Sequence, residues 1–152
     1  MPTSRRALAD RRVGSVLRVL VVGTDDWAVE QSAEVLADAR CEVSRCHEPG
    51  EPAFPCNLLH PERGGCPLDR VDVVVDVRAS ASVNVMPGEM GAICALRADR
   101  PLVLAGLTAH NPFGGWEAAT VALGGDLREA CASVAGEQAI DLRDVPARLP
   151  SL

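Results

Sequence analysis

The chain has 152 residues, of which 47% are hydrophobic and 24% are charged, and its formal net charge is −6. A chain of this length buries a sizeable core, so we expect one globular domain. The composition excludes a mostly disordered chain, a collagen-like repeat and a coiled coil. Aromatic residues make up only 3% of the chain, which argues against binding through stacked aromatic platforms.

The charged residues are unevenly spread and chemically unusual. Residues 1–18 hold five arginines against one aspartate, whereas the rest of the chain is acidic. An acidic body disfavours nucleic-acid binding, because phosphate contacts dominate the affinity of such complexes. All 15 basic residues are arginine. The lack of lysine excludes a Walker-type phosphate loop, a Schiff-base lysine and a kinase-type ATP lysine.

The predicted elements begin after a basic arm at residues 1–15, which we expect to be flexible. Residues 16–23 form a β-branched apolar run that ends in glycine, which predicts a buried parallel strand. Thr24 or Asp25 can cap the amphipathic helix that follows. Alternating residues at 41–46 predict a second strand.

Residues 47–69 differ in character from the rest of the chain. They carry five prolines and several glycines, so neither a long helix nor a long strand is expected there. We interpret this Cys/Pro/Gly-rich stretch as an irregular loop insertion, with one helical turn near residues 57–60.

The remaining elements alternate between strands and helices. The sequence predicts a strand at 71–77, a helix at 87–98, a strand at 101–105, and short helices at 116–123 and 126–135. Asp126 and Glu129 have the spacing of a capping box, and Leu127, Ala130, Cys131 and Val134 form the buried stripe of the last helix.

Strands that alternate with helices predict an α/β fold, with three αβα layers around a doubly wound, mostly parallel sheet of four or five strands. This domain covers residues 16–135, and a tail at 136–152 completes the chain. Ligand sites in such folds lie at the carboxyl ends of the strands. Asp25, Asp26, Asp76 and Thr108 follow or end predicted strands, so we expect an acidic pocket at this edge.

Several short motifs resemble the receiver domain of bacterial response regulators. The strand at Val19–Val22 precedes an acidic pair, Asp76 stands near the end of VDVVVDVR, Met86-Pro87-Gly88 opens a helix, and Leu107-Thr108-Ala109 matches the switch region. The resemblance covers about residues 16–135. It implies a CheY-like, flavodoxin-like fold with Asp76 at the position of the phospho-accepting aspartate.

The resemblance is to a degenerate receiver domain. Receivers carry a lysine after the fifth strand, and this chain has no lysine. Asp25 and Asp26 also stand two residues farther from the strand than the receiver pair does. Phosphoryl transfer needs cationic stabilisation, and the planar guanidinium of arginine does not replace a point ammonium. We therefore expect a pseudo-receiver that signals without phosphorylation, and a divalent cation at the acidic residues is the less favoured option.

Six cysteines supply the second functional clue. Cys46, Cys56 and Cys66 bracket the irregular loop, and Cys94 lies on the following helix. The loop is too irregular to be stable by itself, and its thiolates could bind a structural zinc ion or an iron–sulfur cluster that stabilises it. No Cys-x-x-Cys pair is present, and free cysteines are often simply buried. Burial in the core is the favoured interpretation for Cys41 and Cys131, and it competes with metal binding for Cys94.

Histidines complete the candidate donors. His47 and His60 lie among the loop cysteines, where an exposed loop position is the favoured interpretation over a ligand. Nucleophilic catalysis by Cys56 or Cys66 with His60 would need an activating environment that the sequence does not indicate.

We expect a non-catalytic regulatory module that binds a protein partner or ligand. The alternatives are a small metalloprotein with zinc or an iron–sulfur cluster at Cys46, Cys56, Cys66 and Cys94, and a thiol-dependent enzyme. A homodimer remains open. No apolar run is long enough for a membrane span, and no apolar export region follows Ser4-Arg5-Arg6. The sequence therefore predicts a cytoplasmic protein without membrane contact, whose cysteines are reduced.

Overall fold

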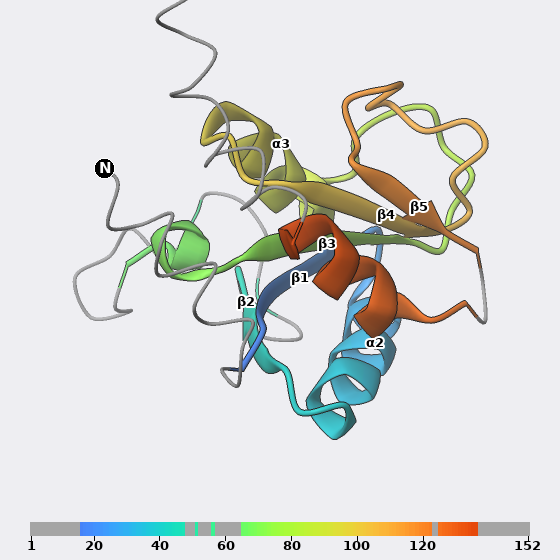
Figure 1. Ribbon diagram of the computed structural model, residues 1–152. Helices are drawn as coiled ribbons and strands as arrows, with labels where there is room; N and C mark the ends of the chain where they lie inside the picture. Colours follow the sequence, from blue (N-terminus) through green and yellow to red (C-terminus); the bar gives the residue numbers. More distant parts are fainter. Residues whose placement is uncertain (1–15, 48–50, 52–55, 57–64, 123–124, 137–152) are drawn as a thin grey trace, which may run out of the picture.

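The computed structural model describes residues 16–47, 51, 56, 65–122 and 125–136. Five parallel strands form one sheet in the order β2-β1-β3-β4-β5 (Figure 1). The strands are β1 (Arg18–Gly23), β2 (Glu42–Arg45), β3 (Val73–Arg78), β4 (Leu102–Gly106) and β5 (Ala119–Val121). The predicted α/β fold with a parallel sheet is confirmed.

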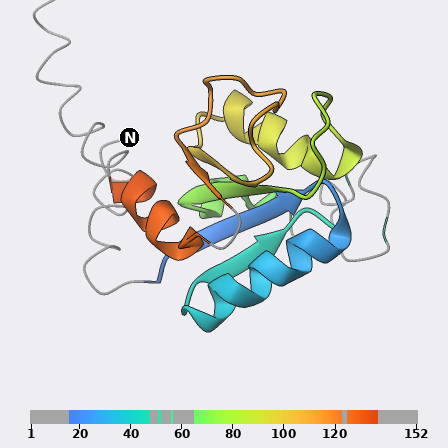
Figure 2. The ribbon, with the colours of Figure 1, turned by 90° about the vertical axis from the view of Figure 1, so that its right-hand side faces the viewer.

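Helices cover both faces of this sheet (Figure 2). On one face, helix α2 (Asp26–Asp38) and a helix at residues 127–136 pack against valines of β1 and β3. On the other face, the 3-10 helices η3 (Pro67–Arg70) and η4 (Pro87–Glu89) precede and follow β3, and η4 leads into α3 (Met90–Arg97). Leu20, Val22, Val74 and Leu104 pack on this second face with Ala92 and Ala95 of α3.

The helix caps follow from the sequence. The backbone N–H of Ala28 donates a hydrogen bond to Asp25 Oδ1 at 2.8 Å, which makes Asp25 the cap of α2. The other predicted cap, Thr24, accepts a hydrogen bond from the Ala79 N–H instead. At the helix of residues 127–136, the Glu129 N–H donates to Asp126 Oδ1 at 2.9 Å, as the capping-box spacing predicts.

The prediction of a helix at 116–123 is wrong, because this segment contains strand β5. Ala119, Thr120 and Val121 pair in parallel with β4, whose backbone N–H and C=O groups would otherwise face solvent at the edge of the sheet. Thr120 and Val121 are β-branched and suit a pleated surface. Pairing with a distant strand therefore outweighs the local helical spacing.

The irregular insertion is only partly described. Its last residues form the short helix η3, with Pro67 and Leu68 buried, so the expectation of an irregular loop is corrected at this end. The expected turn at 57–60, the arm at 1–15 and most of the tail at 136–152 lie outside the described residues.

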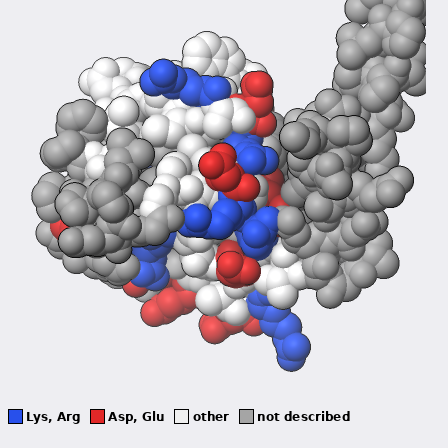
Figure 3. All heavy atoms as spheres, turned by 90° about the vertical axis from the view of Figure 1, so that its left-hand side faces the viewer, with Lys and Arg blue, Asp and Glu red and all other residues white. Residues whose placement is uncertain are grey.

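The described surface carries charges of both signs. Figure 3 shows one face of the molecule, on which acidic and basic side chains are interspersed. Among the described residues, no helix has the length and apolar character that a membrane crossing requires.

Candidate functional site

Four cysteines that are far apart in the sequence line one cavity of about 90 Å³. Cys46 directly follows β2, Cys66 precedes η3, Cys94 lies on α3, and Cys56 belongs to the insertion. These are the four residues that the sequence nominates as metal ligands. The structure therefore brings the whole predicted set to one place, beside Pro87, Gly88 and Gly91 at the start of α3.

The close approach of α3 to the neighbouring strands depends on Gly91. A Cβ atom at this position would lie 2.5 Å from Val22 Cγ1 and 2.9 Å from the sulfur of Cys46. Both distances are too short for real contacts, so only glycine allows the helix to pack against β1 and the residue after β2. Gly91 thereby lets Cys46 and Cys94 share a cavity.

Two thiols of this cavity, those of Cys46 and Cys94, have raised pKa values. Burial first, and then the neighbouring thiols of Cys66, Cys56 and Cys94, raise the pKa of Cys46 to about 12. The pKa of Cys94 is raised by burial first and then by Cys66 and Cys56. Cys46 and Cys94 therefore lack the low pKa of a catalytic nucleophile. A bound cation would reverse this balance, because metal binding displaces the thiol protons.

The donors line the walls of the cavity rather than crowd around one point. Within the described part of the chain, no three His, Cys, Asp or Glu side chains are grouped closely enough to hold a metal ion as they stand. Cys56 and Cys94 are exposed and Cys46 and Cys66 are half-buried. Metal binding here requires the thiols to draw together, as happens where metal binding and folding are coupled.

The other two cysteines lie on the opposite face of the sheet. Cys41 and Cys131 are buried in the apolar cluster that α2 and the helix at 127–136 form with the strands. Burial raises the pKa of Cys131 to about 12. The prediction that both are core residues is confirmed.

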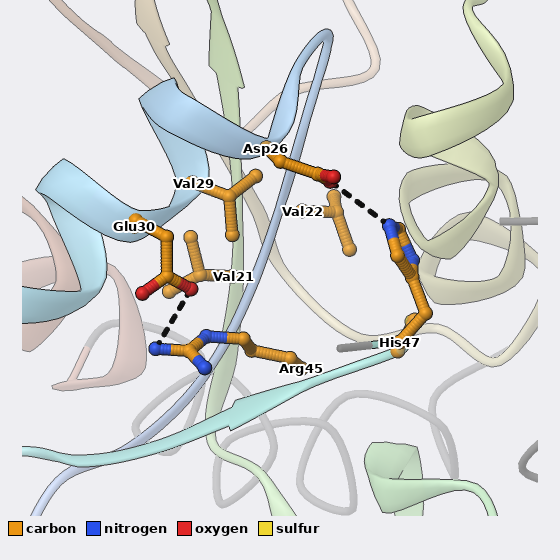
Figure 4. Close-up of a pocket in the computed structure, with 8 residues that line it drawn as sticks. Val21, Val22, Asp26, Val29, Glu30, Arg45 and His47 are labelled. Carbon is orange, nitrogen blue, oxygen red and sulfur yellow. Dashed lines mark hydrogen bonds and ion pairs between the residues drawn. The ribbon is translucent and has the colours of Figure 1, made fainter. Parts of the chain in front are cut away.

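His47 is less exposed than the sequence predicts. Its side chain is only 15% exposed, and it lines the same cavity as the four cysteines. Its Nε2 lies 3.2 Å from Oδ1 of Asp26, the first residue of α2 (Figure 4). Arg45 and Glu30 form an ion pair of 3.0 Å next to it, in the same small groove between α2 and β2. Its position directly after Cys46 was the only signal in the sequence.

The four residues of the expected acidic pocket occupy different environments. Asp25 and Asp26 are exposed at the start of α2, where Asp25 caps the helix. Thr108 is half-buried, and its carbonyl accepts a hydrogen bond from Asn111 Nδ2 at 2.7 Å. Asp76 is completely buried. Its carboxyl group is thus withdrawn from the surface on which the other aspartates lie.

Asp76 belongs to a buried charged cluster that the sequence did not indicate. It lies two residues inside β3, between Val22 of β1 and Leu104 of β4. Burial, followed by the neighbouring Glu89, raises its pKa to about 9. Asp76 therefore holds a proton at neutral pH.

Arg78 balances the remaining charge of this cluster. Its Nη1 donates to Glu89 Oε2 at 2.6 Å, and both side chains are fully buried. Its Nη2 donates to the Ser82 carbonyl, while Glu89 Oε1 accepts from the Met86 N–H at 2.9 Å. The cluster fixes the segment that carries η4, and η4 forms one wall of the cysteine cavity.

Comparison with known proteins adds no family to this geometry. No protein-family model matches the chain, and no curated protein is significantly similar to it. The function must therefore be argued from the site itself.

Proposed function

We propose that this chain is a non-catalytic regulatory module that binds a metal centre, zinc or an iron–sulfur cluster, through the thiolates of Cys46, Cys56, Cys66 and Cys94. The observation that carries the proposal is the convergence of these four thiols on one cavity. They come from the end of β2, the insertion, the start of η3 and helix α3.

The chemistry of the donors supports a soft metal. Thiolates select zinc, copper(I) and iron–sulfur clusters over magnesium and calcium, which prefer oxygen ligands. The centre would supply a cross-link between segments that are far apart in the sequence. Cys46 and Cys66 already pack against the apolar cluster beneath α3, so ligands there would tie the insertion to the sheet. A module built in this way changes the shape of one sheet edge when it gains or loses its metal.

Elemental analysis tests this proposal directly. The reduced protein, purified without oxygen and without added metal, should contain about one equivalent of zinc, or of an iron–sulfur cluster with matching sulfide. Cys46→Ala and Cys66→Ala should each lose it. Cys41→Ala and Cys131→Ala are the matched controls, because these buried thiols lie on the other face of the sheet. Metal below about a tenth of an equivalent in the unaltered protein would overturn the proposal.

The regulatory part of the proposal draws on the strand order. A parallel sheet with the order β2-β1-β3-β4-β5 has the arrangement of flavodoxin-like and CheY-like folds. The burial of Asp76 supports a pseudo-receiver that acts by binding a protein partner instead of by phosphorylation, because a buried carboxyl group cannot reach a phosphodonor.

Intact mass spectrometry tests this second part. After incubation with a small phosphodonor and Mg²⁺, the protein should keep its unmodified mass. Stoichiometric phosphorylation that disappears in Asp76→Asn would refute the pseudo-receiver proposal and leave the metal proposal standing.

A further inference from the structure

We propose that His47, oriented by Asp26, binds the metal centre through Nδ1 in place of one of the four thiolates of the cysteine cavity. This inference rests on the proposed function, since it concerns the same centre. It adds an imidazole to a site that the sequence describes by its thiols alone.

The first support is the position of His47. It follows Cys46 directly at the carboxyl end of β2, and it lines the cavity together with Cys46, Cys56, Cys66 and Cys94. Its side chain is 15% exposed, so the ring is mostly packed within the protein. The ring of a histidine on an exposed loop would instead lie mostly in solvent.

The second support is the orientation of the imidazole ring. Asp26 Oδ1 lies 3.2 Å from Nε2 of His47, and Figure 4 shows the two side chains pointing toward each other across Val22. Histidines that bind metals almost always donate their other ring N–H to a carboxylate or carbonyl group, which fixes the tautomer and the ring. With Nε2 turned to Asp26, Nδ1 is the nitrogen that remains for the cavity.

Charge gives a physical reason for a nitrogen donor. Four thiolates around a divalent cation leave a net charge of about −2, whereas three thiolates and an imidazole leave about −1. Outside its first 18 residues the chain is acidic, and it contains no lysine. A neutral ligand therefore lowers the cost of burying the centre.

Cobalt(II) is the probe for this inference, because its d–d absorption reports the identity of the ligands. The reduced apo-protein is titrated with Co²⁺ alone, without oxygen. The unaltered protein should show thiolate-to-cobalt charge transfer and d–d bands. His47→Gln should retain the charge transfer, shift the d–d bands and weaken Co²⁺ binding.

Two further variants separate ligation from folding. Asp26→Asn should keep the d–d band positions but weaken Co²⁺ binding by about 10–100-fold, as expected for an orienting partner. His110→Gln, on an exposed position after β4, is the control and should behave like the unaltered protein. Far-UV circular dichroism checks that each variant is folded.

Each outcome bears on a different claim. If His47→Gln leaves the d–d bands unchanged while Co²⁺ still binds, His47 is no ligand and the inference is overturned, whereas the proposed function stands. If Asp26→Asn binds Co²⁺ with unchanged affinity, the orienting role of Asp26 is overturned. If the unaltered protein shows no thiolate-to-cobalt charge transfer, the inference and the proposed function fall together.

Discussion

Replacing Asp76 by Asn is expected to stabilise the protein at neutral pH, although the change removes a fully buried carboxyl group. Burial and the neighbouring Glu89 raise the pKa of Asp76 from 3.8 to about 9. At pH 7 the folded protein therefore holds a proton on Asp76 that the unfolded chain releases. Asparagine has a similar shape and can donate its amide N–H to Glu89, but it needs no proton to be buried.

The sign of the pH dependence follows from proton linkage. The folded state binds one more proton than the unfolded state between about pH 4 and about pH 9, so the free energy of unfolding falls as the pH rises. The contribution is fully present below the unfolded pKa and is lost as the pH rises through the folded pKa. Its slope is at most about 1.4 kcal/mol per pH unit. Between about pH 5.5 and about pH 7.5, the free energy of unfolding of Asp76→Asn should therefore rise by up to about 2.7 kcal/mol relative to that of the unaltered protein.

Urea denaturation followed by far-UV circular dichroism is the suitable assay. Trp27 and Trp116 are already 70% and 71% exposed in the folded protein, so their fluorescence reports unfolding poorly. The free energy of unfolding of the unaltered protein is subtracted from that of the variant at each pH. This subtraction cancels the contribution of the histidines and exposed carboxyl groups, which titrate in both proteins. Glu89→Gln is the contrasting variant. It leaves the buried Arg78 without its counter-ion and should cost about 3–5 kcal/mol.

Two results would refute this reasoning. The difference in free energy of unfolding between Asp76→Asn and the unaltered protein should change with pH. If it stays constant, Asp76 is ionised in the folded state. If Glu89→Gln does not lower the free energy of unfolding, another group balances the charge of Arg78.

Three simpler substitutions test the packing around the site. Gly91→Ala places a Cβ 2.9 Å from the sulfur of Cys46. It should lower the free energy of unfolding by about 1–3 kcal/mol in thermal or urea denaturation and weaken metal retention. A variant with unchanged stability would contradict the close packing. Asp25→Ala removes the acceptor of the Ala28 N–H and should cost about 1 kcal/mol, whereas Asp25→Ser should recover most of it. Gly106 has a φ of 93°, and a Cβ there would lie 2.5 Å from the Arg78 carbonyl oxygen. Gly106→Ala should therefore lower the free energy of unfolding by about 1–3 kcal/mol in urea denaturation, and an unchanged value would refute this reasoning.

The core and most elements of the fold follow from local patterns. The valine runs at β1 and β3 are continuous because these strands are buried on both faces of the sheet, and the helix at residues 127–136 shows the 3.6-residue spacing of a half-buried helix. Strand β5 does not follow in this way. Its three residues are strand only because β4 lies beside them, and no local pattern encodes that neighbour.

The candidate site was predictable by residue type but not by geometry. Cysteines on a loop rich in proline and glycine leave a soft-metal site and simple burial as the two alternatives. Their convergence depends on the parallel crossover that places α3 beside the end of β2 and on the missing side chain of Gly91. The raised pKa of Asp76 could not be predicted for the same reason, because Asp76 and Glu89 become neighbours only when β3 and η4 have packed.

The parallel pairing of all five strands has a consequence for the order of assembly. All four strand pairings are parallel, so no two neighbouring strands are joined by a hairpin. Each pairing requires the closure of a long connection, which costs entropy before the contacts form and slows folding. Cys46 follows β2 and Cys94 precedes β4, so β1 and β3 lie between the strands next to these two cysteines in the sheet. The two thiols therefore share a cavity only in the assembled sheet, and the metal centre that we propose would form after the sheet does.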